Sequence, residues 1–167
     1  MKITAQEEYG LRCLLQLARA TQGRVVSVKE IASREGLSAA YAEKLLRILS
    51  RAGLVHSMRG MNGGYMLNRP AMQITLGEVV RALGTVETTT HICTVFTGHL
   101  DACVHFRDCG LRSVWSGLTT YIQNFLDHTT LASLLENEYT VSARLAKRIR
   151  GVSLRPDTAA NPEESKR

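Results

Sequence analysis

Apolar side chains recur at steps of three and four residues along most of this chain, which predicts a mainly helical protein. The first periodic stretch predicts a helix over residues 5–20 that begins at a capping box formed by Thr4 and Glu7. Two shorter stretches follow, and Gly36 separates them because glycine readily adopts the left-handed turn that ends a helix. Since Ser38 can cap the second of these helices, the pattern predicts a helix-turn-helix.

Beyond Gly53, which terminates the second helix, the pattern becomes strand, glycine-rich turn and strand over residues 54–67. The dipeptide Asn62-Gly63 is a strong signal for a tight hairpin turn. Thr75 then caps a helix predicted over residues 76–83, again with a glutamate three residues later. The fold class predicted is mainly α: a winged helix-turn-helix with a small two-stranded wing and a long dimerisation helix.

The long helix is predicted after a segment, residues 84–110, that lacks periodicity. Its apolar stripe is wide and comprises Leu111, Val114, Trp115, Leu118, Tyr121, Ile122, Phe125 and Leu126. A small domain does not easily cover so wide a stripe, so part of it is interpreted as a subunit interface. Packing of the whole helix within its own monomer is the alternative.

These patterns divide the chain into four predicted regions. Residues 1–84 form the DNA-binding domain and residues 85–110 a cysteine-bearing sensor loop. Residues 111–138 hold the dimerisation helix and a short following helix, which starts at Leu131. Residues 139–167 are predicted to be a basic, disordered tail because they are rich first in Arg and Lys and then in Pro, Asn, Glu and Ser.

Composition excludes some classes of protein. No apolar run approaches the roughly 20 residues that a membrane helix needs, and the N-terminus lacks the pattern of a secretory signal. We therefore expect a cytoplasmic protein without a membrane partner. Residues 1–75 carry 11 basic and 5 acidic side chains, whereas residues 76–139 carry 3 and 7. A basic front end favours an anionic partner such as nucleic acid, although a solvated surface can give the same charge.

Cysteine positions indicate metal or redox chemistry rather than disulfides, because the cytoplasm keeps thiols reduced. Cys93, Cys103 and Cys109 fall in the aperiodic loop, and thiolates suit iron–sulfur clusters and zinc. The loop histidines are alternative ligands but are more commonly surface residues: they are His91, His99 and His105. Cys13 lies on the first helix beside its apolar face and is expected to be structural.

The second helix of the helix-turn-helix predicts how DNA is read, since side chains near its N-terminus reach base edges in the major groove. The helix offers Ser38, Ala39, Tyr41, Glu43 and Lys44 there. Ser38 and Tyr41 can hold phosphates, Glu43 can accept a hydrogen bond from cytosine, and Lys44 can meet guanine or a phosphate. Arg47 and Arg51 lie further along and either touch the DNA backbone or form a solvated face. In the wing, Arg59 suits a narrow minor groove. The wing glycines, which either approach phosphates closely or simply form the turn, are Gly60, Gly63 and Gly64.

In its order of elements and its motifs, the chain resembles the Rrf2 family of bacterial transcription regulators, which includes iron–sulfur cluster regulators and nitric-oxide-sensitive repressors. The resemblance covers roughly residues 1–138. The motifs that carry it are Met1-Lys-Ile-Thr, Ile31-Ala32, Leu37-Ser38, Tyr41, Arg51-Ala-Gly-Leu-Val55, Arg59-Gly60, Gly63-Gly64-Tyr65, Ile74-Thr75-Leu76 and the three clustered cysteines. It implies a homodimer with antiparallel dimerisation helices that binds palindromic operators.

The resemblance also implies a ligand set. The three loop cysteines would hold an iron–sulfur cluster, and the fourth ligand would be either a histidine three residues after the last cysteine or a carboxylate at the eighth position of the partner subunit. Arg112 stands at the first of these positions and Glu8 at the second, so Glu8 is the expected ligand. This set favours a 4Fe-4S over a 2Fe-2S cluster. Two departures stand out: nine residues separate Cys93 from Cys103 where the family has five, and Met61 replaces a wing proline.

The predicted function is a DNA-binding transcription regulator, a repressor, whose operator affinity is controlled by a cluster that senses redox state, nitric oxide or iron–sulfur status. One alternative is a cluster-free regulator of the same fold that senses by thiol oxidation or a small ligand. An alternative of another class is an iron–sulfur electron-transfer or scaffold protein. No nucleophile–base pair, phosphate loop or paired-carboxylate motif predicts an enzyme.

Overall fold

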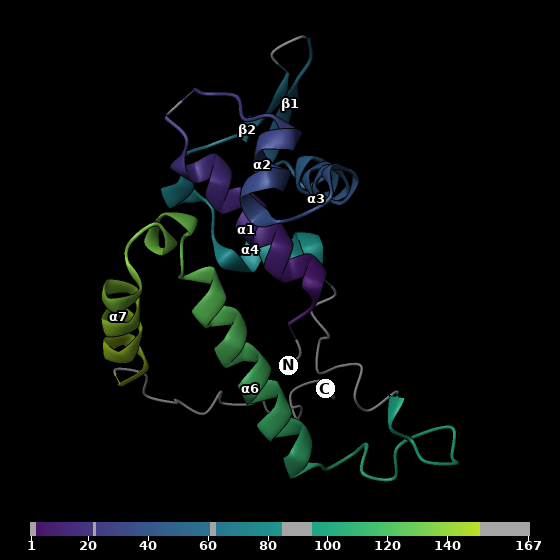
Figure 1. Ribbon diagram of the computed structural model, residues 1–167. Helices are drawn as coiled ribbons and strands as arrows, with labels where there is room; N and C mark the ends of the chain where they lie inside the picture. The colour runs from purple at the N-terminus through teal and green to yellow at the C-terminus, as the bar shows by residue number, and fades with distance from the viewer. Residues whose placement is uncertain (1–2, 22, 61–62, 85–94, 151–167) are drawn as a thin grey trace, which may run out of the picture. The chain divides into compact units, whose positions relative to one another are not determined.

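The computed structural model describes residues 3–21, 23–60, 63–84 and 95–150, and the chain divides into two compact units, Met1–Leu135 and Glu136–Arg167. The first unit holds the predicted helix-turn-helix: α1 (Ala5–Arg19), α2 (Val28–Glu35) and α3 (Ala39–Arg51). All three helices contact one another, and the hairpin stands beside them (Figure 1).

Local capping fixes where these helices begin and end. Thr4 and Glu7 form the predicted capping box at α1, and the Ser38 hydroxyl accepts a hydrogen bond from the Tyr41 N–H at α3. Gly36 ends α2 in the left-handed region, with φ of 66°. The turn between α2 and α3 is therefore set by one capping serine and one glycine, as predicted.

The wing is the two-stranded antiparallel sheet β1 (Val55–Met58) and β2 (Gly64–Leu67), in which Ser57 is opposite Tyr65. A backbone bridge ties it to the segment before α2: Val26 and Tyr65 exchange two N–H···O bonds of 2.9 Å. A Cβ at Gly64 would stand 2.2 Å from the Val26 carbonyl oxygen, so this close approach requires glycine. The wing base is thereby attached to the helices.

The core lies between α1, α2, α3, the wing base and α4 (Leu76–Leu83), which begins at the predicted Thr75–Glu78 capping box. The 3-10 helices η1 (Ala71–Gln73) and η3 (Leu131–Leu134) close it, and the Leu131 N–H donates to the Ile74 carbonyl. The fully buried side chains include Leu14, Val26, Ile31, Leu45, Leu46, Leu49, Ile74, Val79 and Leu131. The short helix predicted over 131–138 is this four-residue 3-10 helix.

The long helix α6 (Gly110–Asp127) differs from α1, α2, α3 and α4 in that none of its residues is buried. Its exposed fractions are 63% at Leu111 and Val114, 42% at Trp115 and 47% at Leu118. Its C-terminal end is attached to α4 through the Arg81–Asp127 ion pair of 2.8 Å. The alternative in which this helix packs wholly within its own monomer does not describe the structure of the single chain.

The second unit contains α7 (Glu138–Arg150), where the sequence predicted the start of a disordered tail. The Asn137 side chain caps this helix by accepting from the Thr140 N–H at 2.9 Å. Ala, Arg, Leu and Lys, which favour helix formation, make up much of its length. The prediction of disorder considered the polar composition of this region and not its helix propensity. Residues 151–167 lie outside the described residues.

Candidate nucleic-acid interface and cysteine loop

The N-terminal half of α3 presents most of the predicted reading side chains to solvent. Ser38, Ala39 and Lys44 are exposed, and Glu43 is half-buried. Tyr41 is also half-buried because its ring packs edge-on against Tyr9 of α1, with the centroids 6.1 Å apart. Tyr41 therefore contributes to the packing of α1 on α3 as well as to the exposed end of the helix.

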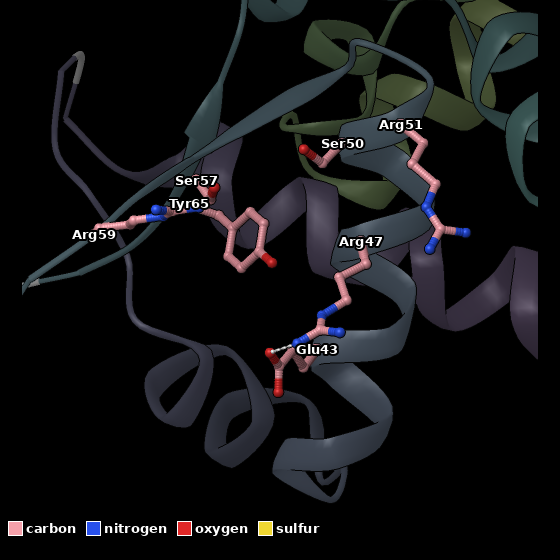
Figure 2. A pocket seen from close by; sticks show the side chains of 7 residues that line it. All are labelled: Glu43, Arg47, Ser50, Arg51, Ser57, Arg59 and Tyr65. Atoms are coloured by element: carbon pink, nitrogen blue, oxygen red, sulfur yellow. Dashed lines mark hydrogen bonds and ion pairs between the residues drawn. The ribbon is translucent and has the colours of Figure 1, made fainter.

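A hollow lies between α3 and the wing, and side chains from both elements line it (Figure 2). The residues that line it are Glu43, Arg47, Ser50, Arg51, Ser57, Arg59 and Tyr65. Three of the seven are arginines, so the hollow has the charge and the donors that a phosphate requires. The structure thus brings Arg47, Arg51 and Arg59 together, although Arg59 is far from the other two in sequence.

One carboxylate offsets this positive charge. Glu43 accepts a hydrogen bond from Arg47 at 2.7 Å, and this bond raises the pKa of the Arg47 guanidinium (Figure 2). The Arg47 side chain remains 65% exposed, so the pair is solvated and contributes little stability. Tyr65 of the wing also interacts with the Arg47 guanidinium and contributes a smaller part of the rise in its pKa. Because the side chain is mostly exposed, Arg47 can exchange Glu43 for a phosphate.

Ser50, Ser57 and Tyr65 line the hollow but were missed by sequence reasoning. Ser50 lies one turn after Arg47, and strand pairing places Ser57 opposite Tyr65. Figure 2 shows the Tyr65 side chain reaching from the wing toward α3. Helical spacing from Arg47 was the available signal for Ser50, whereas Ser57 and Tyr65 required the hairpin register.

The wing glycines serve different backbone needs. Gly60 is exposed with φ of 111°, which glycine tolerates, and the Gly63 N–H donates to its carbonyl at 3.0 Å. Gly64 instead allows the close approach to Val26. The structure therefore supplies a turn-forming or packing reason for these glycines, and their contact with phosphates stays a prediction.

Two of the three clustered cysteines lie in the described part of the loop. Cys103 and Cys109 are free, half-buried thiols, and Cys109 is the N-cap residue of α6. Cys93 and His91 lie outside the described residues. His99 and His105 are exposed on the surface of the loop. Across residues 3–21, 23–60, 63–84 and 95–150, no three His, Cys, Asp or Glu side chains are grouped closely enough to hold a metal ion.

The predicted fourth ligand, Glu8, is exposed on the first turn of α1. The structure does not bring it to Cys103 and Cys109 within one chain, which agrees with its expected role from the partner subunit but does not test it. The donor set itself fits a soft metal centre: two accessible thiols, a third in the same loop by sequence, and an exposed carboxylate.

Arg12, one turn after Glu8, is engaged elsewhere. Its Nε donates to the Glu35 carboxylate at 2.6 Å, and its guanidinium carbon lies 5.3 Å from the centroid of the Tyr9 ring. The Glu35 side chain is only 7% exposed. Because Glu35 is the last residue of α2, this ion pair joins α1 to the C-terminal end of α2. Sequence spacing did not reveal this ion pair because its members are 23 residues apart.

Cys13 is fully buried in the core, in agreement with a structural role. Burial, assisted by the negative charge of Glu35, raises its pKa from 9.0 to about 11. The thiol is therefore protonated at neutral pH and unsuited to metal binding or rapid oxidation.

Comparison with known proteins agrees with this architecture. Residues 3–137 match the family model Rrf2, described as an iron-dependent transcriptional regulator. The chain is 35% identical over 137 residues to Protein rrf2 of Nitratidesulfovibrio vulgaris strain Hildenborough, which covers 82% of this chain and 89% of that protein. No helix in the described part of the chain combines the length and apolar character needed to cross a membrane.

Several solved structures share the fold, among them the following two. CymR (YrzC), the global cysteine regulator of B. subtilis, superimposes with a TM-score of 0.66 at 31% identity and covers 81% of this chain and 96% of its own. T. potens IscR superimposes with a TM-score of 0.62 at 29% identity and covers 92% and 93%. Members of the matched family are transcription regulators rather than enzymes, as the sequence predicted. With its helix-turn-helix, wing and long exposed helix, this chain belongs to the Rrf2 family of DNA-binding transcription regulators.

Proposed function

We propose that this protein is a homodimeric repressor that binds a palindromic operator and whose affinity for DNA is controlled by an iron–sulfur cluster. The observation that carries the DNA-binding part is the arginine-lined hollow between α3 and the wing. One element there can enter the major groove while the other reaches the neighbouring minor groove. The family of transcription regulators to which the chain belongs supports this part.

In the proposed complex, Lys44 and Glu43 lie at base edges because they are in the N-terminal half of α3, and Ser38, its N-cap residue, holds a phosphate. Arg47 and Arg51 bind backbone phosphates, and Arg59 enters the minor groove, where its charge responds to groove width. Release of Glu43 from Arg47 on binding leaves the carboxylate able to accept from a cytosine amino group.

The dimer is supported by the apolar face of α6. Leu111, Val114, Trp115 and Leu118 are each at least 42% exposed, and side chains of this kind favour removal from water. A second copy of the same helix, antiparallel to the first, would cover this face by two-fold symmetry. That arrangement would also place two helix-turn-helix units in one molecule, as a palindromic operator requires.

Cys93, Cys103 and Cys109 would hold the cluster together with Glu8 of the partner subunit. The bound cluster would supply a centre that reacts with oxidants and nitric oxide. The chain supplies thiolate ligands from one loop and a carboxylate from another subunit, so occupancy of the site joins the two halves. Cys109 is also the N-cap residue of α6. Loss or oxidation of the cluster would therefore act directly at the end of the proposed dimerisation helix.

A second candidate is a cluster-free regulator that senses thiol oxidation. The observation that favours it is that Cys103 and Cys109 are free and partly accessible, and that similar solved structures include the B. subtilis cysteine regulator and an oxidized form of S. aureus CymR. In this case two thiols would form a disulfide and give two electrons and two protons to an oxidant such as hydrogen peroxide.

Anaerobic purification separates the two candidates. We expect a coloured protein containing iron and sulfide, with an absorption spectrum that Cys93→Ala, Cys103→Ala and Cys109→Ala abolish and Glu8→Ala weakens. Cys13→Ala is the matched control, because that thiol is buried in the core. A colourless protein that binds its operator until peroxide is added would support the thiol mechanism. Absence of sequence-specific binding in a gel-shift assay would contradict both.

A further inference from the structure

The segment between Cys103 and Cys109 forms a turn that runs directly into α6. The Phe106 N–H donates to the Cys103 carbonyl at 3.0 Å, and the Arg112 N–H donates to the Cys109 carbonyl at 3.1 Å. Cys103 is therefore the first residue of the turn, and Cys109 is the residue at which the helix begins. The separation of the two thiols depends on how this turn is folded back onto the first turn of α6.

Little apolar burial holds the turn in place. Among residues 95–109, only Thr97, Cys103 and Cys109 are even partly buried, and Phe106 is 63% exposed. Exposed segments without a core keep one conformation only when specific polar contacts fix them. The described loop therefore needs a hydrogen-bond donor that reaches its backbone.

The Arg112 side chain supplies that donor. Its Nη2 donates to the carbonyl oxygens of His105, at 3.1 Å, and of Phe106. Its guanidinium carbon lies 5.5 Å from the centroid of the Phe106 ring, which is the distance of a cation–π contact. A guanidinium is planar and always charged, so one side chain can bind two successive carbonyls and face an aromatic ring at the same time.

We propose that Arg112 is a positioning residue that fixes the turn and thereby sets the geometry of the Cys103 and Cys109 thiols. Arg112 stands where the family resemblance would place a ligand histidine, yet here its guanidinium binds the loop backbone. A lysine at this position would keep the charge but would not reproduce the two carbonyl bonds and the ring contact together. The importance of this geometry for sensing rests on the function proposed above, whereas the clamp itself does not.

Proteolysis of the reduced, cluster-free, full-length protein tests the clamp without any metal. Chymotrypsin cleaves after aromatic residues, so its cleavage after Phe106 reports whether the turn opens. Arg112→Gln is expected to speed this cleavage about tenfold because charge-assisted hydrogen bonds to the turn are lost. Arg19→Gln is the matched control, since it removes the same charge from an exposed position of α1 and leaves the residues on both sides of the cleaved bond unchanged. Equal cleavage rates in Arg112→Gln and wild type, or an equal increase in the control, would overturn the proposal.

Cobalt binding tests whether the clamp sets the thiol geometry. Co²⁺ alone is titrated into the reduced protein, and its thiolate charge-transfer absorption is followed. We expect Arg112→Gln to weaken Co²⁺ binding about tenfold, as the ligands lose their preorganisation, and Arg112→Lys to recover only part of it. Full recovery with lysine would show that charge alone matters and would overturn positioning, as would unchanged binding in Arg112→Gln. The helical content of each variant is checked by circular dichroism.

The two proposals fail separately. A wild-type protein that never assembles a cluster, but in which Arg112→Gln opens the turn and weakens Co²⁺ binding, overturns the cluster and supports the clamp. A wild-type protein that assembles the cluster, together with an Arg112→Gln variant unchanged in cleavage and Co²⁺ binding, supports the cluster and overturns the clamp.

Discussion

Apolar side chains are buried in the helix-turn-helix and its wing, but they are exposed along the long helix α6. Leu45, Leu46 and Leu49 of α3 are fully buried, whereas Leu111 and Leu118 of α6 are 63% and 47% exposed. The surface predicted to read DNA therefore rests on a core that one chain completes by itself. The exposed apolar face of α6 is not completed within the chain, and a second subunit would cover it in the proposed dimer.

The largest effect is expected from a substitution in the α3 core. Leu46→Ala leaves a cavity under α3, and we expect the free energy of unfolding to fall by about 2–5 kcal/mol, measured by urea denaturation. Leu118→Ala removes the same atoms from an exposed position of α6, so at a protein concentration that keeps the chain monomeric its effect should be within about 0.5 kcal/mol. Similar losses in both variants would remove the contrast between the two regions.

A charge on α6 should separate folding from self-association. Leu118→Asp is expected to keep the circular dichroism of the wild type but to shift the mass in light scattering from dimer to monomer, because an unpaired carboxylate cannot be buried cheaply in an apolar interface. Operator binding should fall with it, since one subunit contacts only one half-site. A variant that remains dimeric would mean that α6 is not the interface. Asn124→Asp, also exposed on α6 and outside the apolar face, is the matched control.

A wing substitution should affect DNA binding alone. Arg59→Ala is expected to weaken operator binding by about 1–3 kcal/mol and to reduce the slope of log K against log salt by about 1. Stability should not change, because Arg59 is exposed. Arg19→Ala, which removes an exposed charge at the far end of α1, should leave binding and slope close to wild type. If both variants lose affinity equally, only net charge matters.

The buried thiol predicts a smaller, pH-dependent effect. Below pH 9, Cys13 is protonated in the folded and unfolded chains alike, so its contribution to stability is complete. Between pH 9 and 11 the unfolded chain ionises first, because burial raises the folded pKa to about 11, and stability falls as the pH rises. The difference in unfolding free energy between wild type and Cys13→Ala should shrink across this window. A difference independent of pH would contradict the raised pKa.

The smallest effect is expected where α6 joins the core. Arg81 and Asp127 are 49% and 40% exposed, and pairs of this kind contribute about 0–1 kcal/mol. Arg81→Gln should therefore change the melting temperature little in physiological salt. A large loss would show that α6 depends on this ion pair more than its exposure indicates.

The sequence was most informative where structure is local. The Thr75 capping box and the bounds of α4 match the prediction, as do the turn at Gly36 and the cap at Ser38. Each depends on residues within a few positions of one another, which a single sequence displays directly. Cys13 was also identified as structural, because its place on the apolar face of one helix was visible.

Contacts between distant segments were not predictable. The close approach of Gly64 to the carbonyl of Val26, 38 positions earlier, was not predicted. The Arg12–Glu35 ion pair was not predicted, because its two members lie on different helices. The hollow beside Arg47 likewise required the hairpin register that places Tyr65 opposite Ser57. Such pairs depend on tertiary packing, for which one sequence gives no direct signal.

Because Cys109 is the N-cap residue of α6, the same residue belongs to the proposed ligand set and to the proposed dimer helix. Binding of the cluster and formation of the dimer would then be coupled. If the cluster raises the dimerisation constant by some factor, dimerisation raises the affinity for the cluster by the same factor. If Glu8 of the partner subunit completes the site as proposed, this coupling would be stronger, since a lone subunit would lack a complete ligand set. The threshold at which such a sensor responds would therefore shift with the concentration of the protein itself, so that changes in its expression level would retune its sensitivity.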